Sequence, residues 1–467
     1  MEERILTKDR IMEYATMDGL TKMTGVTPEM FDIYIIKELI DNSLDACELY
    51  NIQPKIKVTV KVKEDFLYLS VADNGPGLGE EQIKEIVNFT RYSGTKYYVK
   101  KPTRGAQGNA LMTILGLPGI LSYVTGKPNS KIIISTQQHT YLIKIIVDKV
   151  MQEIKPEITK IEPTRKSGTQ ISIILPLLET KLYGTSWTNN SHKLWGEHGR
   201  YYDLIEGFSL WNPHVAFKLR YNNKRKAIVD EFAPTITKCR KFSHPGFGSV
   251  YWYKEEDFID LVYANIRANK EQNKKETIIN FAKRFKGCTG NRTELTRALT
   301  KGLTDKYIDS LNDDKGKKAK ILFQNLKEVS KPLNKLVLGE IGREHFYKVI
   351  SKYGVIHEKL FQYGKINGIY EGIPYVMEVA ICKVKKLKKK RVQFGINMTV
   401  TYDLPFGDTT FTADLSKRDY RGSTTAEGLQ GLLEKYHIDD DSGVFVAMHV
   451  ITPNVRYKDY GKSEIEE

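Results

Sequence analysis

The chain has 467 residues, a formal net charge of +15 and an isoelectric point near 9.2. Hydrophobic residues make up 40% of it and charged residues 28%, which excludes a disordered chain and leaves room for about three domains. The basic excess favours a polyanionic partner, nucleic acid before an acidic membrane, although a merely basic soluble protein has the same composition.

The sequence shows no sign of export or of membrane insertion. Its N-terminus is charged, and the longest apolar stretch, residues 110–121, is too short to span a bilayer. The four cysteines form no CxxC pair and the nine histidines have no metal-ligand spacing, which argues against a disulfide framework and a zinc finger. We therefore expect a cytoplasmic protein.

Helix and strand patterns alternate over the first 175 residues. Residues 32–50 have helical spacing, and residues 56–62 and 66–72 alternate apolar and polar side chains as strands do. Further strand-like runs lie at 131–136, 140–147 and 169–175. This pattern predicts an α+β fold, with a mostly antiparallel sheet and helices on one face.

In the rest of the chain, the predicted secondary structure changes twice. Residues 254–335 are mainly helical in pattern, and mixed structure then returns. Residues 376–384 and 392–402 indicate a strand pair, 444–452 a buried strand and 424–436 a helix. These shifts predict three domains, at residues 1–235, 236–330 and 331–467.

The helix at 32–50 carries the sharpest chemical pattern. Glu38, Asn42 and Asp45 fall at i, i+4 and i+7, so they share one helix face. A carboxylate and an amide one turn apart suit water activation and magnesium coordination. An ordinary amphipathic helix with a solvated polar stripe has the same pattern.

Three further segments suggest a ligand site, each weakly by itself. Asp73 ends a strand and precedes Gly75 and Gly77, which places a carboxylate beside an open loop, although a hairpin turn has the same chemistry. The glycine-rich residues 104–110 lead into a helical segment, as an anion cradle does. Thr169 opens a strand directly after a glycine.

In order and spacing, these segments resemble the ATP-binding fold that gyrase, heat-shock chaperones, histidine kinases and MutL share (the GHKL superfamily). The resemblance implies ATP and Mg²⁺ as cofactors, with Glu38 as the general base, Asn42 as the magnesium ligand and Asp73 as the reader of the adenine amine. Gly105 and Gly108 would lie in a lid over the phosphates. The remaining nucleotide contacts that it implies are Asp45, Gly75, Gly77, Lys96, Arg104, Gln107, Asn109 and Thr169.

Three observations bear on the resemblance. The third glycine expected in the lid is Ala110 here, which is a departure from the family pattern. Gly461-Lys462-Ser463 looks like the end of a Walker loop, but Arg456 stands where that motif needs a glycine. Only about 30 residues precede the helix of Glu38, too few for the phospho-acceptor helix of a histidine kinase.

Later segments are similar to the B subunit of topoisomerase VI. Residues 251–302 resemble its helix-two-turn-helix insert, and residues 448–464 resemble its last transducer strand and switch loop. In that family a lysine of the switch loop reaches the γ-phosphate, and Lys462 matches it best, with Lys458 second. The resemblance therefore adds Lys462 to the catalytic and nucleotide-binding residues.

The family resemblance implies an ATPase subunit of a type IIB topoisomerase. Such a protein dimerises on ATP as a clamp on double-stranded DNA, and a separate Toprim-type partner, the A subunit, cuts the DNA within a heterotetramer. The family continues into a stalk helix, whereas this sequence stops at Glu467. The alternative is a GHKL ATPase switch in a DNA-sensing repair or defence system that works with a nuclease.

Residues 383–391 carry seven positive charges in nine positions between two predicted strands. We expect a hairpin tip that contacts the DNA backbone, although a solvated loop has the same composition. The candidate DNA-binding residues are Lys385, Lys386, Lys388, Lys389 and Lys390.

Overall fold

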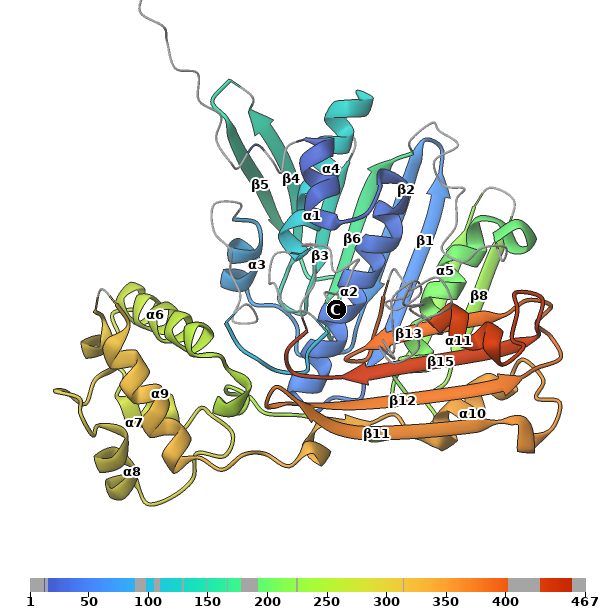
Figure 1. Ribbon diagram of the computed structural model, residues 1–467. Helices are drawn as coiled ribbons and strands as arrows, with labels where there is room; N and C mark the ends of the chain where they lie inside the picture. The colour runs from blue at the N-terminus through green and yellow to red at the C-terminus, as the bar shows by residue number, and fades with distance from the viewer. Residues whose placement is uncertain are drawn as a thin grey trace, which may run out of the picture.

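The computed structural model describes residue 12 and residues 16–88, 98–104, 110–127, 130–148, 150–165, 167–177, 192–223, 226–313, 315–401 and 429–455. An eight-stranded sheet with helices, a group of short helices and a five-stranded sheet follow one another along the chain (Figure 1). Within the described ranges, no helix combines the length and the hydropathy needed to cross a bilayer.

The first sheet has the strand order β5-β4-β3-β6-β2-β1-β7-β8. Every neighbouring pair is antiparallel except β1 and β7, which are parallel. The prediction of an α+β fold with a mostly antiparallel sheet is thereby confirmed. The strands are β1 (Lys55–Lys63), β2 (Phe66–Ala72), β3 (Lys131–Ser135), β4 (Thr140–Asp148), β5 (Glu153–Ile161), β6 (Gln170–Pro176), β7 (Ala216–Asn222) and β8 (Ala227–Phe232).

Helix α2 (Phe31–Leu49) lies at the centre of the helices that cover the first sheet. It packs against β1 and β2 and also against α4 (Ala110–Thr125) and α5 (His192–Trp211). Because it is enclosed in this way, its buried residues include charged ones as well as apolar ones. The other helices here are α1 (Met17–Thr24) and α3 (Glu80–Ile86).

The group of short helices is built around clustered phenylalanines. Phe258 of α6 (Glu255–Glu271) packs against Phe281, Phe285 and Phe323 with tilted or edge-on ring contacts. A two-stranded ribbon of β9 (Arg240–Lys241) and β10 (Gly339–Glu340) joins the segments that precede and follow the group. The remaining helices are α7 (Ile278–Ala282), α8 (Arg292–Leu299) and α9 (Lys317–Val329).

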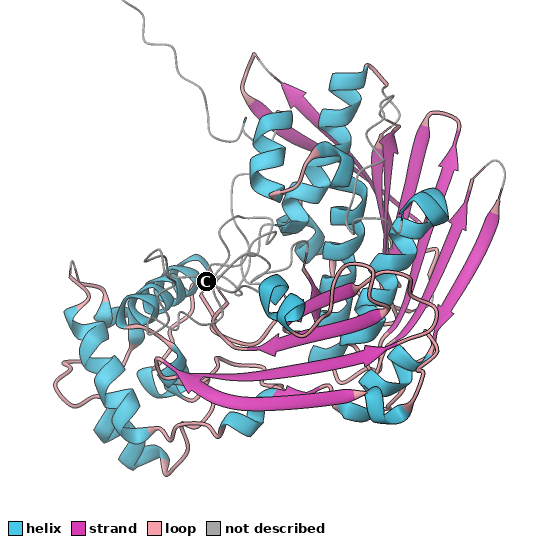
Figure 2. Cartoon of the chain, turned by 45° about the vertical axis from the view of Figure 1, so that its right-hand side comes forward, coloured by secondary structure: helices cyan, strands magenta, loops and turns pink. Residues whose placement is uncertain are grey.

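The second sheet has the order β11-β12-β15-β13-β14, and the group of short helices lies at one of its ends (Figure 2). Its strands are β11 (Gln362–Tyr370), β12 (Ile373–Lys383), β13 (Arg391–Ile396), β14 (Thr399–Val400) and β15 (Val444–Ile451). The described helices in this part of the chain are α10 (Arg343–Ser351) and α11 (Leu429–Lys435).

One expectation about this sheet is wrong. We expected residues 376–384 and 392–402 to pair directly, but β15 lies between β12 and β13, antiparallel to the first and parallel to the second. Seven of the eight residues of β15 are buried, which is typical of a central strand with both faces covered. The lysine-rich segment is therefore a connection across β15 and not a hairpin tip.

Candidate functional site

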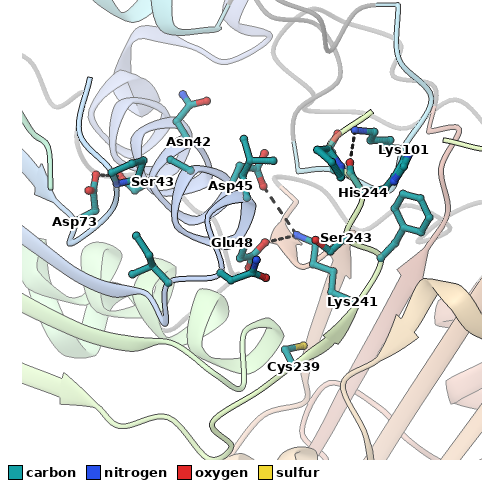
Figure 3. A pocket seen from close by; sticks show the side chains of 18 of the residues that line it. Asn42, Ser43, Asp45, Glu48, Asp73, Lys101, Cys239, Lys241, Ser243 and His244 are labelled. Carbon is teal, nitrogen blue, oxygen red and sulfur yellow. Dashed lines mark hydrogen bonds and ion pairs between the residues drawn. The ribbon is translucent and has the colours of Figure 1, made fainter. Parts of the chain in front are cut away.

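A cavity of about 1060 Å³ opens beside helix α2, a volume that suits a nucleotide-sized ligand. Asn42, Asp45, Asp73, Gly77 and Thr169, all of which the sequence singled out, line it. Figure 3 shows Asn42, Ser43 and Asp45 on α2 and Asp73 beside them. The fold thus brings together residues from α2, from the end of β2 and from the start of β6.

Asp73 is held by three donors. One carboxylate oxygen, Oδ2, accepts from Ser43 Oγ at 3.0 Å. The other, Oδ1, accepts from the backbone N–H groups of Gly75 at 2.8 Å and Thr169 at 3.0 Å. A carboxylate has about four acceptor positions, so these contacts leave capacity for one further donor from the cavity.

Glycine is required where the segment that follows β2 meets the segment that precedes β6. Gly168 has a φ of +68°, and a Cβ there would lie 2.0 Å from the carbonyl oxygen of Asp73. This close approach lets the N–H of Thr169 reach the Asp73 carboxylate. Gly77 also has a left-handed φ, of +89°, which side chains rarely adopt.

Asn42 lies one helical turn from Glu38, and its side chain is partly exposed at the cavity. Its amide oxygen fits a Mg²⁺ ion, because this ion keeps several waters and takes few protein ligands besides phosphate oxygens. Among the described residues, no group of three or more His, Cys, Asp and Glu side chains is arranged to hold a metal.

Glu38 is buried, with 2% of its surface exposed, and it is not among the residues that line the cavity. Its Oε1 lies 3.0 Å from Lys37 Nζ, which also lies 3.0 Å from Asp41 Oδ2. Burial alone would lower the pKa of Lys37, but the adjacent carboxylates of Asp41 and Glu38 outweigh burial and raise it. Lys37 therefore stays charged between the two.

Arg104 is fully buried and does not line the cavity. Its guanidinium donates to Asp45 Oδ1 at 2.9 Å, to both carboxylate oxygens of Glu48 and to Asn212 Oδ1 at 2.5 Å. Its Nε donates to the carbonyl oxygen of Met398 at 3.2 Å. These contacts tie Arg104 to other parts of the protein, and the nucleotide contact that we predicted for it stays a prediction.

Gly75 does not line the cavity either, although its N–H supports Asp73. Several predicted residues lie outside the described ranges, so their roles stay predictions: Lys96, Gly105, Gln107, Gly108, Asn109, Lys458 and Lys462.

The structure also adds residues that the sequence did not single out. Ser43, which donates to Asp73, directly follows Asn42 in the sequence, and this adjacency is the signal that could have marked it. Residues 237–239 and 241–247 line the cavity together with Lys101, and no local sequence pattern marks that segment. Burial, with the charge of Arg284 nearby, lowers the pKa of Lys101 to about 8, and its Nζ donates to the carbonyl oxygen of His244 at 2.7 Å.

The five candidate DNA-binding lysines in the connection between β12 and β13 differ in their exposure to solvent. The side chain of Lys390 is only 6% exposed, and its Nζ lies 3.1 Å from Asp440 Oδ1, which weakens the prediction that it binds DNA. The other four predicted lysines are exposed at the surface: Lys385, Lys386, Lys388 and Lys389.

Residues 33–179 match the family described as "Histidine kinase-, DNA gyrase B-, and HSP90-like ATPase". The chain is also similar to proteins named as the B subunit of "Type 2 DNA topoisomerase 6". The one from Natronomonas pharaonis is 34% identical over 220 residues, which cover 45% of this chain and 24% of the relative. That of Methanosarcina acetivorans is 24% identical, covering 77% and 53%. That of Methanococcoides burtonii is 23% identical, covering 93% and 65%. The matches thus span between 24% and 65% of these relatives.

Proposed function

Because residues 33–179 form a GHKL-type ATPase domain and the chain is a relative of the topoisomerase VI B subunit, we propose that it binds and hydrolyses ATP as the ATPase subunit of a type IIB topoisomerase. The observation that carries the proposal is Asp73, which lines the cavity with acceptor capacity left after its three internal hydrogen bonds. An exocyclic amine of adenine supplies the donor that fits this position, whereas the oxygen of guanine there would be repelled.

Asn42 and Glu38 have different proposed roles near the phosphates of the bound ATP. Asn42 holds Mg²⁺, which when bound neutralises charge on the phosphates. Glu38 takes the proton of the attacking water as general base. Lys462, with Lys458 as second choice, stabilises the γ-phosphate, and the lid residues Gly105 and Gly108 cover the phosphates. Lys96, Gln107 and Asn109 remain proposed nucleotide contacts.

We also propose the larger assembly that the family resemblance implies. Two copies of this chain close on ATP as a clamp around double-stranded DNA, and a separate Toprim-type partner, the A subunit, cleaves the DNA in a heterotetramer. The proposed domains are 1–235 for ATP, 236–330 for the helix-two-turn-helix unit and 331–467 for the transducer. A cytoplasmic location is consistent with the four free cysteines.

The experiment compares Glu38→Gln with the parental chain in ATP binding and in ATP hydrolysis. A general base is needed for turnover but not for affinity, so the variant should bind ATP normally and hydrolyse it about 10²–10⁴-fold more slowly. Glu85→Gln, at an exposed position of α3, is the matched control and should keep the parental rate. A Glu38→Gln chain that hydrolyses ATP at the parental rate would show that the helix has been assigned wrongly.

A further inference from the structure

The turn between β13 and β14 has an unusual backbone. Its two central residues, Asn397 and Met398, have φ values of +50° and +65°, and they join strands paired as Ile396 with Thr399. Two-residue turns with both φ values positive favour Asn followed by Gly, because a side chain at the second position is strained. Methionine occupies that second position here, and it is buried, with 1% of its surface exposed.

Contacts from three other segments of the chain hold the strained residue. The N–H of Met398 donates to His449 Nε2 of β15 at 3.0 Å. Its carbonyl oxygen accepts from Arg104 Nε at 3.2 Å and from Asn212 Nδ2 at 2.9 Å. A conformation of this kind persists only where the surroundings determine it fully, and it is often associated with function.

The next residue, Thr399, reaches helix α2. Its Oγ1 donates to Asp41 Oδ2 at 2.8 Å, and both residues are 2% exposed. The same Asp41 oxygen lies 3.0 Å from Lys37 Nζ, which lies 3.0 Å from Glu38 Oε1. A buried chain of polar contacts thus runs from the second sheet to Glu38, and in low dielectric such contacts hold their partners in one geometry.

We infer that Thr399 is a positioning residue for ATP hydrolysis, acting on Glu38 through Asp41 and Lys37. The inference rests on the proposed function, in which Glu38 is the general base. When the second sheet is docked, Thr399 holds Asp41, Asp41 shares Lys37 with Glu38, and the Glu38 carboxylate keeps one orientation. If the sheet moves away, Asp41 loses this donor, its carboxylate can turn, and the position of Lys37 between Asp41 and Glu38 is no longer held. This link involves no nucleotide contact, so it affects turnover and not affinity.

The first test compares side chains at position 399 in the full-length chain. Thr399→Val keeps the shape and removes the hydroxyl, so kcat for ATP should fall roughly tenfold to a hundredfold, as for a lost hydrogen bond to a charged group, while KM and ATP affinity stay parental. Thr399→Ser restores the hydroxyl and should recover the parental kcat. The matched control is Thr401→Val, because Thr401 donates to the carbonyl oxygen of Phe394 and does not reach α2 through a described contact.

A double-mutant cycle identifies the route. If Thr399 acts through Asp41, then Thr399→Val should have no further effect on kcat in an Asp41→Ala chain. Full additivity of the two changes, or a parental kcat in folded Thr399→Val, overturns the inference. Thermal melting checks the fold, and Thr399→Ala replaces Thr399→Val in the same comparisons if the valine variant does not fold.

The Glu38→Gln chain separates the two proposals. An inactive Glu38→Gln chain beside a fully active Thr399→Val chain contradicts only the positioning role. A fully active Glu38→Gln chain contradicts the proposed function, and with it this inference.

Discussion

The guanidinium of Arg104 forms a two-pronged ion pair with the carboxylate of Glu48, with Nη1 at 2.7 Å from Oε2 and Nη2 at 2.6 Å from Oε1. Lys241 Nζ and His214 Nε2 also lie within 3.0 Å of the carboxylate. Burial would raise the pKa of Glu48, but the charges of Arg104 and Lys241 outweigh it and hold the pKa well below its usual range. The pair ties the end of α2 to the residue that precedes the proposed lid.

Replacing Arg104 tests whether it is structural. Arg104→Met removes the main partner of Glu48, and because Lys241 and His214 still contact that carboxylate, the free energy of unfolding should fall by at most about 3–5 kcal/mol. Chemical denaturation measures this. Arg267→Met, at an exposed position of α6, is the control and should change stability little. A variant of parental stability that instead binds ATP poorly would restore the nucleotide contact that we first predicted.

Asp73→Asn should weaken ATP binding. The change replaces one acceptor oxygen with an NH₂ group, which donates. Ser43, Gly75 and Thr169 all donate to this side chain, so the new group would face donors in place of acceptors. A hydrogen bond to a charged group contributes about 1.5–3 kcal/mol, so affinity should fall roughly tenfold to a hundredfold. Calorimetric titration with ATP and GTP measures both affinity and base preference. Unchanged affinity and unchanged preference would place the adenine elsewhere; Asp65→Asn, in the exposed turn after β1, is the control.

Nucleotide state should control oligomeric state. With Mg²⁺ and a non-hydrolysable ATP analogue, the chain should sediment as a dimer, whereas ADP should hold the dimer less firmly. Glu38→Gln should give the same dimer with ATP itself, because it cannot remove the γ-phosphate. A sedimentation coefficient that no nucleotide changes would contradict the clamp.

The exposed lysines should contribute to DNA affinity through phosphate contacts. Each phosphate neutralised adds about −0.9 to the slope of log affinity against log salt, so replacing Lys385, Lys386, Lys388 and Lys389 with Ala should flatten the slope on every duplex. Lys390→Ala is a control within the same segment, because Lys390 is paired with Asp440. If the fourfold variant keeps the parental slope, the segment is only solvated.

Acid should destabilise the fold through His345, which is 4% exposed. The ring lies 2.6 Å from Thr235 Oγ1 and 2.9 Å from the carbonyl oxygen of Leu210. Burial lowers its pKa from 6.5 to about 4 despite backbone hydrogen bonds that oppose the shift. The unfolded chain therefore binds a proton at higher pH than the folded chain does.

The contribution of His345 is complete above pH 6.5 and is lost as the pH falls toward 4, by on the order of 3 kcal/mol. Denaturation across this range measures the loss. His345→Gln should flatten the pH dependence, whereas His357→Gln, at an exposed position, should not. An equal slope in both variants would mean that another group titrates.

The amino-acid sequence by itself determined the local part of the site. Helical spacing placed Glu38 one turn from Asn42, and the strand end after Val71 placed Asp73 beside a glycine turn. Such relations span a few residues, so backbone periodicity alone predicts them. The match of α2 and β2 to the predicted helix and strand has this physical cause.

Only the tertiary structure decided which distant segments meet. β15 separates β12 from β13 because a central position buries both of its apolar faces, and no local pattern records which strands will flank it. Arg104 looked like part of a phosphate loop, but Asp45, Glu48 and Asn212 surround it once the chain folds. The contact between Thr399 and Asp41 joins residues 358 positions apart. Burial and hydrogen bonding between remote residues depend on how the layers pack, and short-range spacing carries no information about that packing.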